Sequence, residues 1–107
     1  MSKILIISAT KGNNLSLAKK IGNYVSIDNE IISLEDFDMP LYVPKTEIIK
    51  TDIVKILSEI FIQSKGFIFC APEYNGGSPP ILTNAITWLS VIKDNWRSTF
   101  VNKKAII

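Results

Sequence analysis

The sequence lacks the residues that most metal sites and all disulfides need. Its 107 residues include no histidine and one cysteine, Cys70. Imidazole nitrogens and thiolates are the usual zinc ligands, so this composition argues against a transition-metal site. A single cysteine also excludes an internal disulfide and suits a reducing compartment. We therefore expect a cytoplasmic protein with no resident metal.

Strong charge imbalance and long apolar runs are absent as well. Lysine and arginine number 12, aspartate and glutamate 10, and the charges are interspersed, with no arginine-rich run. This pattern argues against a nucleic-acid partner. The apolar run at residues 4–7 is too short for a signal sequence or a membrane span, so we expect no membrane partner.

Short apolar segments alternate with amphipathic stretches along the whole chain. Four segments have the length and composition of buried strands: residues 4–7, 30–34, 67–71 and 105–107. Apolar residues at helical spacing lie between them. An order of strand, helix, strand, helix, strand, helix, strand predicts a doubly wound α/β fold with a parallel sheet. One domain, residues 1–107, accounts for all of it. The irregular segment 35–44 should pack on this domain through Phe37, Met39, Leu41 and Tyr42.

A polar loop follows the first strand and precedes an apolar helical stripe. Its residues are Ser8, Ala9, Thr10, Lys11, Gly12, Asn13 and Asn14. A helix N-terminus after such a loop offers free N–H groups and hydroxyls to a phosphate. The alternative is a solvated turn in which Asn13 or Asn14 caps the helix. The loop matches neither the dinucleotide GxGxxG pattern nor the Walker pattern.

A second loop follows the third strand. Pro72 ends that strand, and Gly76 and Gly77 allow the backbone to approach a ligand closely. Ser78 is expected to cap the next helix, with Pro79 in its first turn. Both loops should therefore meet at the carboxyl edge of the sheet, where open α/β folds bind ligands.

Residues 71–90 resemble the signature of the NADPH-dependent FMN reductase family, which includes azoreductase-like, quinone-reductase-like and chromate-reductase-like flavoproteins. The family pattern is a Pro-Glu-Tyr-Asn-Gly loop, a proline at the helix start, then Leu-x-Asn-Ala-Ile-Asp-Trp-Leu. Residues 36–42 also resemble the family, and the resemblance extends over residues 3–107. The matching residues of the signature are Pro72, Glu73, Tyr74, Asn75, Gly76, Pro80, Leu82, Asn84, Ala85, Ile86, Trp88 and Leu89.

The resemblance implies a flavodoxin-like fold that binds FMN. The expected strand order is 2-1-3-4, with strand 5 and the last helices of the family absent from this chain. The implied phosphate ligands are Ser8, Thr10, Lys11, Asn13, Asn14, Leu15 and Ser16, with Lys11 near the place of the family's usual arginine. The implied contacts to the isoalloxazine ring are Pro72, Glu73, Tyr74, Asn75 and Gly76.

Several of these residues also have a purely structural interpretation. Tyr74 can be an exposed loop aromatic and Glu73 a solvated carboxylate. Trp88 and Trp96 fit either the core or the dimer interface that the family commonly forms through this helix region. Cys70 is expected to be a small core residue rather than a nucleophile.

The implied activity is an NAD(P)H-dependent oxidoreductase that passes electrons through FMN to a quinone, azo, nitro or flavin acceptor, as a homo-oligomer. Two alternatives stay open: an electron-carrying flavodoxin, and a flavin-free remnant. Family proteins continue well past the fourth strand. Without that continuation we expect a bare edge strand, one sheet face without its covering helix, and a flavin pocket that lacks one wall.

Overall fold

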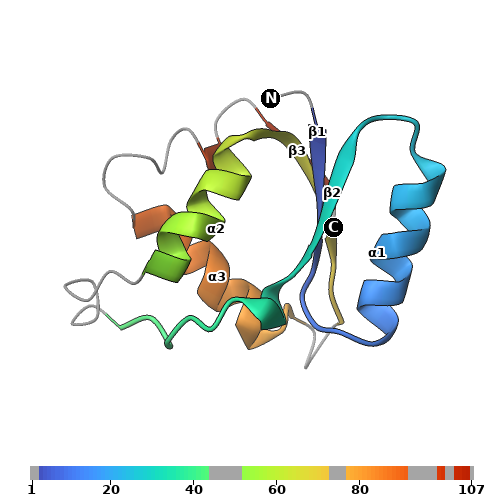
Figure 1. Cartoon of the computed structure of the whole chain (residues 1–107). Coiled ribbons are helices and arrows are strands. Elements are labelled where there is room, and N and C mark those ends of the chain that lie inside the picture. Colours follow the sequence, from blue (N-terminus) through green and yellow to red (C-terminus); the bar gives the residue numbers. More distant parts are fainter. Residues whose placement is uncertain (1–2, 44–51, 73–76, 92–98, 101–102, 107) are drawn as a thin grey trace.

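The computed structural model describes residues 3–43, 52–72, 77–91, 99–100 and 103–106. Figure 1 shows a sheet with α1 on one side and α2 and α3 on the other. None of the helices within these ranges is long and apolar enough to cross a bilayer. The elements are β1 (Lys3–Ser8), α1 (Asn13–Tyr24), β2 (Asn29–Ser33), the 3-10 turn η1 (Leu34–Asp36), α2 (Asp52–Ile62), β3 (Ser64–Cys70), α3 (Pro80–Val91) and β4 (Lys104–Ile106).

All strand pairs in the sheet are parallel, and the strand order is β2-β1-β3-β4. The predicted doubly wound, flavodoxin-like topology is therefore confirmed. The register places Ser8 of β1 beside Ser33 of β2 and Cys70 of β3. The carboxyl ends of these three strands consequently lie at one edge of the sheet.

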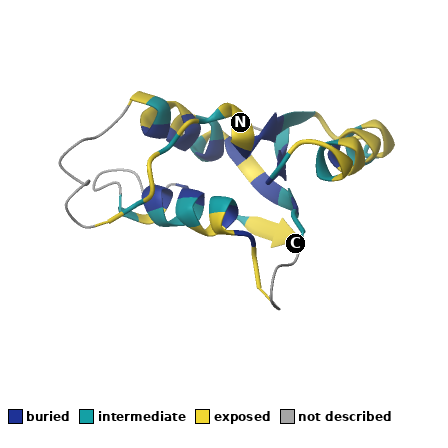
Figure 2. Cartoon of the chain, turned by 90° about the horizontal axis from the view of Figure 1, so that it is seen from below, coloured by how far each residue is buried: buried dark blue, intermediate teal, exposed yellow. Residues whose placement is uncertain are grey.

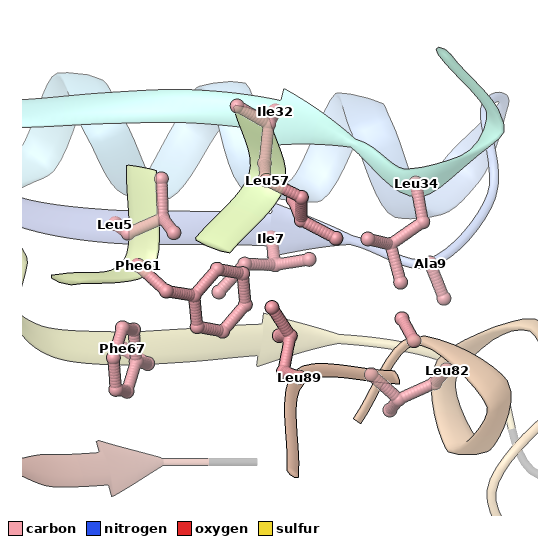
Figure 3. Close-up of a cluster of buried hydrophobic side chains, with 11 residues drawn as sticks. Leu5, Ile7, Ala9, Ile32, Leu34, Leu57, Phe61, Phe67, Leu82 and Leu89 are labelled. Atoms are coloured by element: carbon pink, nitrogen blue, oxygen red, sulfur yellow. The ribbon is translucent and has the colours of Figure 1, made fainter. Parts of the chain in front are cut away.

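The main core fills the space between the sheet and the helices α2 and α3. Figure 3 shows Leu57 and Phe61 of α2 and Leu89 of α3 directed toward side chains of the strands. A smaller cluster on the opposite face joins Ile6, Ala18 of α1 and Cys70. Cys70 is 4% exposed, so its predicted place in the core is confirmed.

Trp88 holds the irregular segment after η1 against α3. The indole is 2% exposed, its Nε1 donates to the carbonyl of Pro40 at 2.7 Å, and its ring meets Tyr42 edge-on at 5.1 Å. Asn84 adds two bonds: its Nδ2 donates to the Pro40 carbonyl, and its Oδ1 accepts the Tyr42 N–H. Trp88 is thus a core residue, whereas Trp96 lies outside the described residues.

The start of α3 differs from the prediction by one residue. The Pro79 carbonyl accepts the N–H groups of Leu82 and Thr83, so Pro79, rather than Ser78, precedes the helix. Pro80 then occupies the first helical position, where a missing N–H costs nothing.

The predicted packing of segment 35–44 is wrong at one residue, because Leu41 is 72% exposed.

The change from helix α2 to strand β3 is abrupt. The helix ends at Ile62, and Ser64 already belongs to β3. The Ser64 hydroxyl donates to the Ile60 carbonyl at 2.8 Å, and the Lys103 ammonium donates to the carbonyls of Phe61 and Ile62. These side chains satisfy carbonyls that a helix end leaves without partners, which permits an abrupt change to strand.

Candidate functional site

The candidate site lies where the chain leaves β1 and β3. The Ala9 N–H donates to the Cys70 carbonyl at 2.9 Å, so the pairing of the two strands continues into their loops. Because β2 and β3 flank β1 on opposite sides, this edge is a topological switch point. The structure therefore places the start of the polar loop after β1 next to the end of β3, and the half-buried Pro72 follows two positions beyond β3.

The loop after β1 is folded on itself by three hydrogen bonds. The Ser8 hydroxyl donates to the carbonyl of Thr10, and the Asn14 Nδ2 donates to the Thr10 Oγ1 at 3.0 Å. The Ser16 N–H donates to the Gly12 carbonyl at 2.9 Å and closes the first turn of α1. Ser8 is fully buried beneath the loop, so it shapes the loop, and its predicted contact with a phosphate stays a prediction.

The N-terminus of α1 is open to an anion. Gly12 precedes the helix with φ of 82°, a left-handed conformation that favours glycine, and no side chain caps the helix in the described part of the chain. The alternative in which Asn13 or Asn14 caps the helix is wrong, because both residues are already helical. The N–H groups of the first turn and the positive end of the helix dipole fit a phosphate.

Two carboxylates hold Lys11, and sequence reasoning missed both. The Lys11 N–H donates to the Glu35 carboxylate, and its ammonium lies 2.8 Å from Asp36 Oδ1. The hydrogen bond to Asp36 and the charge of its carboxylate raise the pKa of Lys11, because both favour the charged ammonium. Both side chains are more than half exposed, and exposed pairs contribute little to stability. One feature of the sequence could have predicted this pairing: Glu35 and Asp36 come directly after β2, so they lie at the same edge of the sheet as the loop after β1.

The loop after β3 is described only in part. Pro72 is described and half-buried, while the predicted flavin contacts Glu73, Tyr74, Asn75 and Gly76 lie outside the described residues. Those contacts therefore stay predictions.

A pocket of about 250 Å³ lies between η1 and α3. Its lining residues are Leu34, Glu35, Phe37, Asp38, Met39, Ile81 and Asn84.

Comparison with protein-family models identifies the family of this chain. Residues 2–107 match the model of the NADPH-dependent FMN reductases. The chain belongs to the NADPH-dependent FMN reductase family. No significant match is found among curated proteins. The family membership rests on nearly the entire chain, and it agrees with the signature at residues 71–90.

Two solved structures share the fold of this chain. FerB, a flavoenzyme NAD(P)H:(acceptor) oxidoreductase from Paracoccus denitrificans, is 20% identical, and the match has a TM-score of 0.80 and covers 98% of this chain and 58% of FerB. An azoreductase from Bacillus anthracis is 13% identical, and the match has a TM-score of 0.60 and covers 82% of this chain and 55% of the azoreductase. The chain thus spans just over half the length of these relatives.

Cys70 provides a chemical probe of this edge of the sheet. Burial raises the pKa of its thiol, which lowers the thiolate fraction at neutral pH and also blocks reagents. We expect iodoacetamide to alkylate the native chain at least about a hundredfold more slowly than the urea-unfolded chain. Cys70 is the single cysteine, so mass spectrometry of the intact chain reports this site alone. Equal rates in both states would show that β3 is not packed as described.

Proposed function

We propose that the chain binds FMN non-covalently and, with NAD(P)H as the hydride donor, acts as an oxidoreductase on a quinone, azo, nitro or flavin acceptor. The observation that carries this proposal is the uncapped N-terminus of α1, which follows the loop at the β1/β3 switch point. Flavodoxin-like folds with this strand order bind FMN at that switch point. The family match over residues 2–107 supports the same cofactor.

The phosphate of FMN would lie against the loop after β1. The N–H groups of Asn13, Asn14 and Leu15 belong to the first turn of α1, and Ser16 contributes a hydroxyl one residue later. The Thr10 hydroxyl accepts a bond from Asn14 and keeps its own hydrogen to donate to the phosphate. Lys11 would exchange its exposed pairing with Asp36 for the stronger charge of the phosphate.

The isoalloxazine ring would lie against Pro72, Glu73, Tyr74, Asn75 and Gly76. FMN, when bound there, would supply the redox chemistry of hydride and electron transfer. The protein orients the ring and sets the hydrogen bonds and charges around it, so no side chain of this chain has to act as a general acid or base.

The acceptor class rests on the names of similar proteins, one an NAD(P)H:(acceptor) oxidoreductase and one an azoreductase. Because the chain covers little more than half of each, the proposal is made for these 107 residues and is tested on them. We further propose that the protein works in the cytoplasm, where the Cys70 thiol stays reduced. A homo-oligomer is part of the same proposal.

The test is NADPH oxidation by the purified 107-residue chain with added FMN and a quinone. We expect turnover that saturates with FMN and exceeds the rate of free FMN with NADPH. Asn14→Asp, argued in the Discussion, should raise the FMN concentration needed for half-maximal rate. A rate equal to that of free FMN would contradict the enzyme proposal. Saturable flavin binding without NADPH turnover would instead support an electron carrier of the flavodoxin kind.

A further inference from the structure

The pocket between η1 and α3 combines an apolar floor with an acidic rim. It has a volume of about 250 Å³, and η1 follows β2, the strand at the opposite end of the sheet from β4. Leu34 belongs to the buried core, and the half-buried Phe37, Met39 and Ile81 pack against that core. Figure 2 shows residues 35–43 as a run of exposed and half-buried residues at the surface. The pocket therefore reaches from the surface to the core.

Two carboxylates, those of Glu35 and Asp38, lie at the rim of the pocket. No basic side chain is among the described residues that line it. The nearest described cation, Lys11, donates its N–H to Glu35 and pairs its ammonium with Asp36. Asp38 is exposed and takes part in neither ion pair that the described part of the chain contains. The charges of the described residues therefore favour a cation in the pocket.

Side-chain hydrogen bonds hold the two walls of the pocket in place. Asn84 of α3 lines the pocket, and its amide donates to the Pro40 carbonyl at 3.0 Å and accepts the Tyr42 N–H at 2.7 Å. Trp88, four residues later on α3, donates to the same Pro40 carbonyl. These bonds fix the segment after η1 against the helix without help from an occupant. The pocket is thus preformed, as small-molecule sites usually are.

The size and lining of the pocket select a small organic molecule. Pockets for drug-sized ligands measure about 300–1,000 Å³. A volume of about 250 Å³ therefore suits one ring with a short arm. Phe37 and Met39 favour an aromatic ring through ring–ring and sulfur–ring contacts. A metal ion would gain nothing from the apolar floor, and no three metal-ligating side chains gather within the described ranges.

We propose that this pocket binds a small arylalkylamine in its protonated form, with the ring on Phe37, Met39 and Ile81 and the ammonium group facing Glu35 and Asp38. An alkylamine resembles the lysine side chain, whose pKa is about 10.4, so it is charged at neutral pH. The pocket meets the loop after β1 at Glu35, which accepts the Lys11 N–H. The proposal goes beyond FMN chemistry, and its test contains no FMN, so a failure of flavin binding leaves it unaffected.

The test titrates the purified 107-residue chain with phenethylammonium and two matched probes. Phenethyl alcohol has the same ring without a charge, and hydrocinnamate has a carboxylate instead. Met39 is one of two methionines, so carbon-13 labelling of methionine methyl groups gives a simple NMR spectrum, and Met39→Leu identifies its signal. Phenethylammonium should shift the Met39 signal saturably, with a Kd of about 1 mM or tighter. The alcohol should bind at least about threefold more weakly, and hydrocinnamate at least about tenfold.

Two exposed aspartates locate the charge effect. Asp28 precedes β2 and Asp38 follows η1, so the two lie toward opposite ends of that strand. Asp38→Asn should weaken phenethylammonium at least about threefold and change phenethyl alcohol by less than about twofold, whereas Asp28→Asn should change both by less than about twofold. Three results would overturn the proposal: no saturable shift of the Met39 signal in the folded chain, equal affinity for all three probes, or equal effects of the two aspartate variants.

Discussion

Asn14→Asp is expected to weaken FMN binding by about tenfold to a hundredfold. The substitution places a carboxylate in the first turn of α1, where the proposed phosphate lies. Two unit charges about 5 Å apart repel by about 3 kcal/mol at an effective dielectric constant of 20, before salt screening. The Thr10 hydroxyl can donate to the new carboxylate, and an acid at a helix N-terminus is stabilising, so the fold should persist. Isothermal titration with FMN measures the change.

Two controls make this result specific. Riboflavin lacks the phosphate, so its affinity should be the same for the parent chain and for Asn14→Asp. Asn23→Asp adds the same charge near the exposed C-terminal end of α1 and should alter FMN affinity by less than about threefold. If both aspartate variants weakened FMN equally, or if riboflavin lost as much affinity as FMN, the phosphate would not lie at the start of α1.

Trp88→Ala is expected to destabilise the fold by about 3–5 kcal/mol, the range for removing a large buried aromatic side chain. The indole is 2% exposed, contacts Tyr42 edge-on, and donates to Pro40. Domains have total stabilities of about 5–15 kcal/mol, so this loss removes a large share. Urea unfolding followed by far-ultraviolet circular dichroism should show a lower midpoint with little change in slope.

The conservative variant Trp88→Phe separates the loss of the hydrogen bond from the loss of the buried ring. Trp88→Phe keeps most of the ring volume and loses the N–H bond to Pro40, so it should cost about 1–2 kcal/mol. Tyr24→Ala removes an aromatic ring that is 91% exposed and should change stability by less than about 0.5 kcal/mol. A Trp88→Ala midpoint equal to that of Tyr24→Ala would show that Trp88 does not anchor the segment at residues 37–43.

The fold was predictable because its two central strands, β1 and β3, each contain an uninterrupted apolar segment. Residues 4–7 and 67–71 have no polar break, which is typical of strands covered on both faces, and the structure places residues 4–7 and 67–70 in the sheet. The alternation with helical spacing then allowed few topologies. The first and last residues of the helices and strands were harder to predict. Pro79 and Ser78 are each plausible before a helix, and the choice depends on which carbonyl accepts the N–H groups of Leu82 and Thr83.

The candidate site was predictable in position and less so in detail. Its place followed from the two polar loops after apolar strands, since carboxyl ends of parallel strands share an edge. The pairing of Lys11 with Asp36 and Glu35 depends on a contact between residues about 25 positions apart, which no local pattern encodes. The burial of Ser8 likewise depends on the hydrogen bond to Thr10 and on the strands packed around it.

The most direct measurement is an FMN titration of the purified 107-residue chain, followed by flavin fluorescence, with riboflavin as the reference ligand. We predict saturable FMN binding in the micromolar range or tighter, with riboflavin about a hundredfold weaker because it forgoes at least two charge-assisted hydrogen bonds. If the chain is folded by circular dichroism yet shows no saturable FMN binding, the loops after β1 and β3 do not form a flavin site by themselves, and the proposed function fails for this chain.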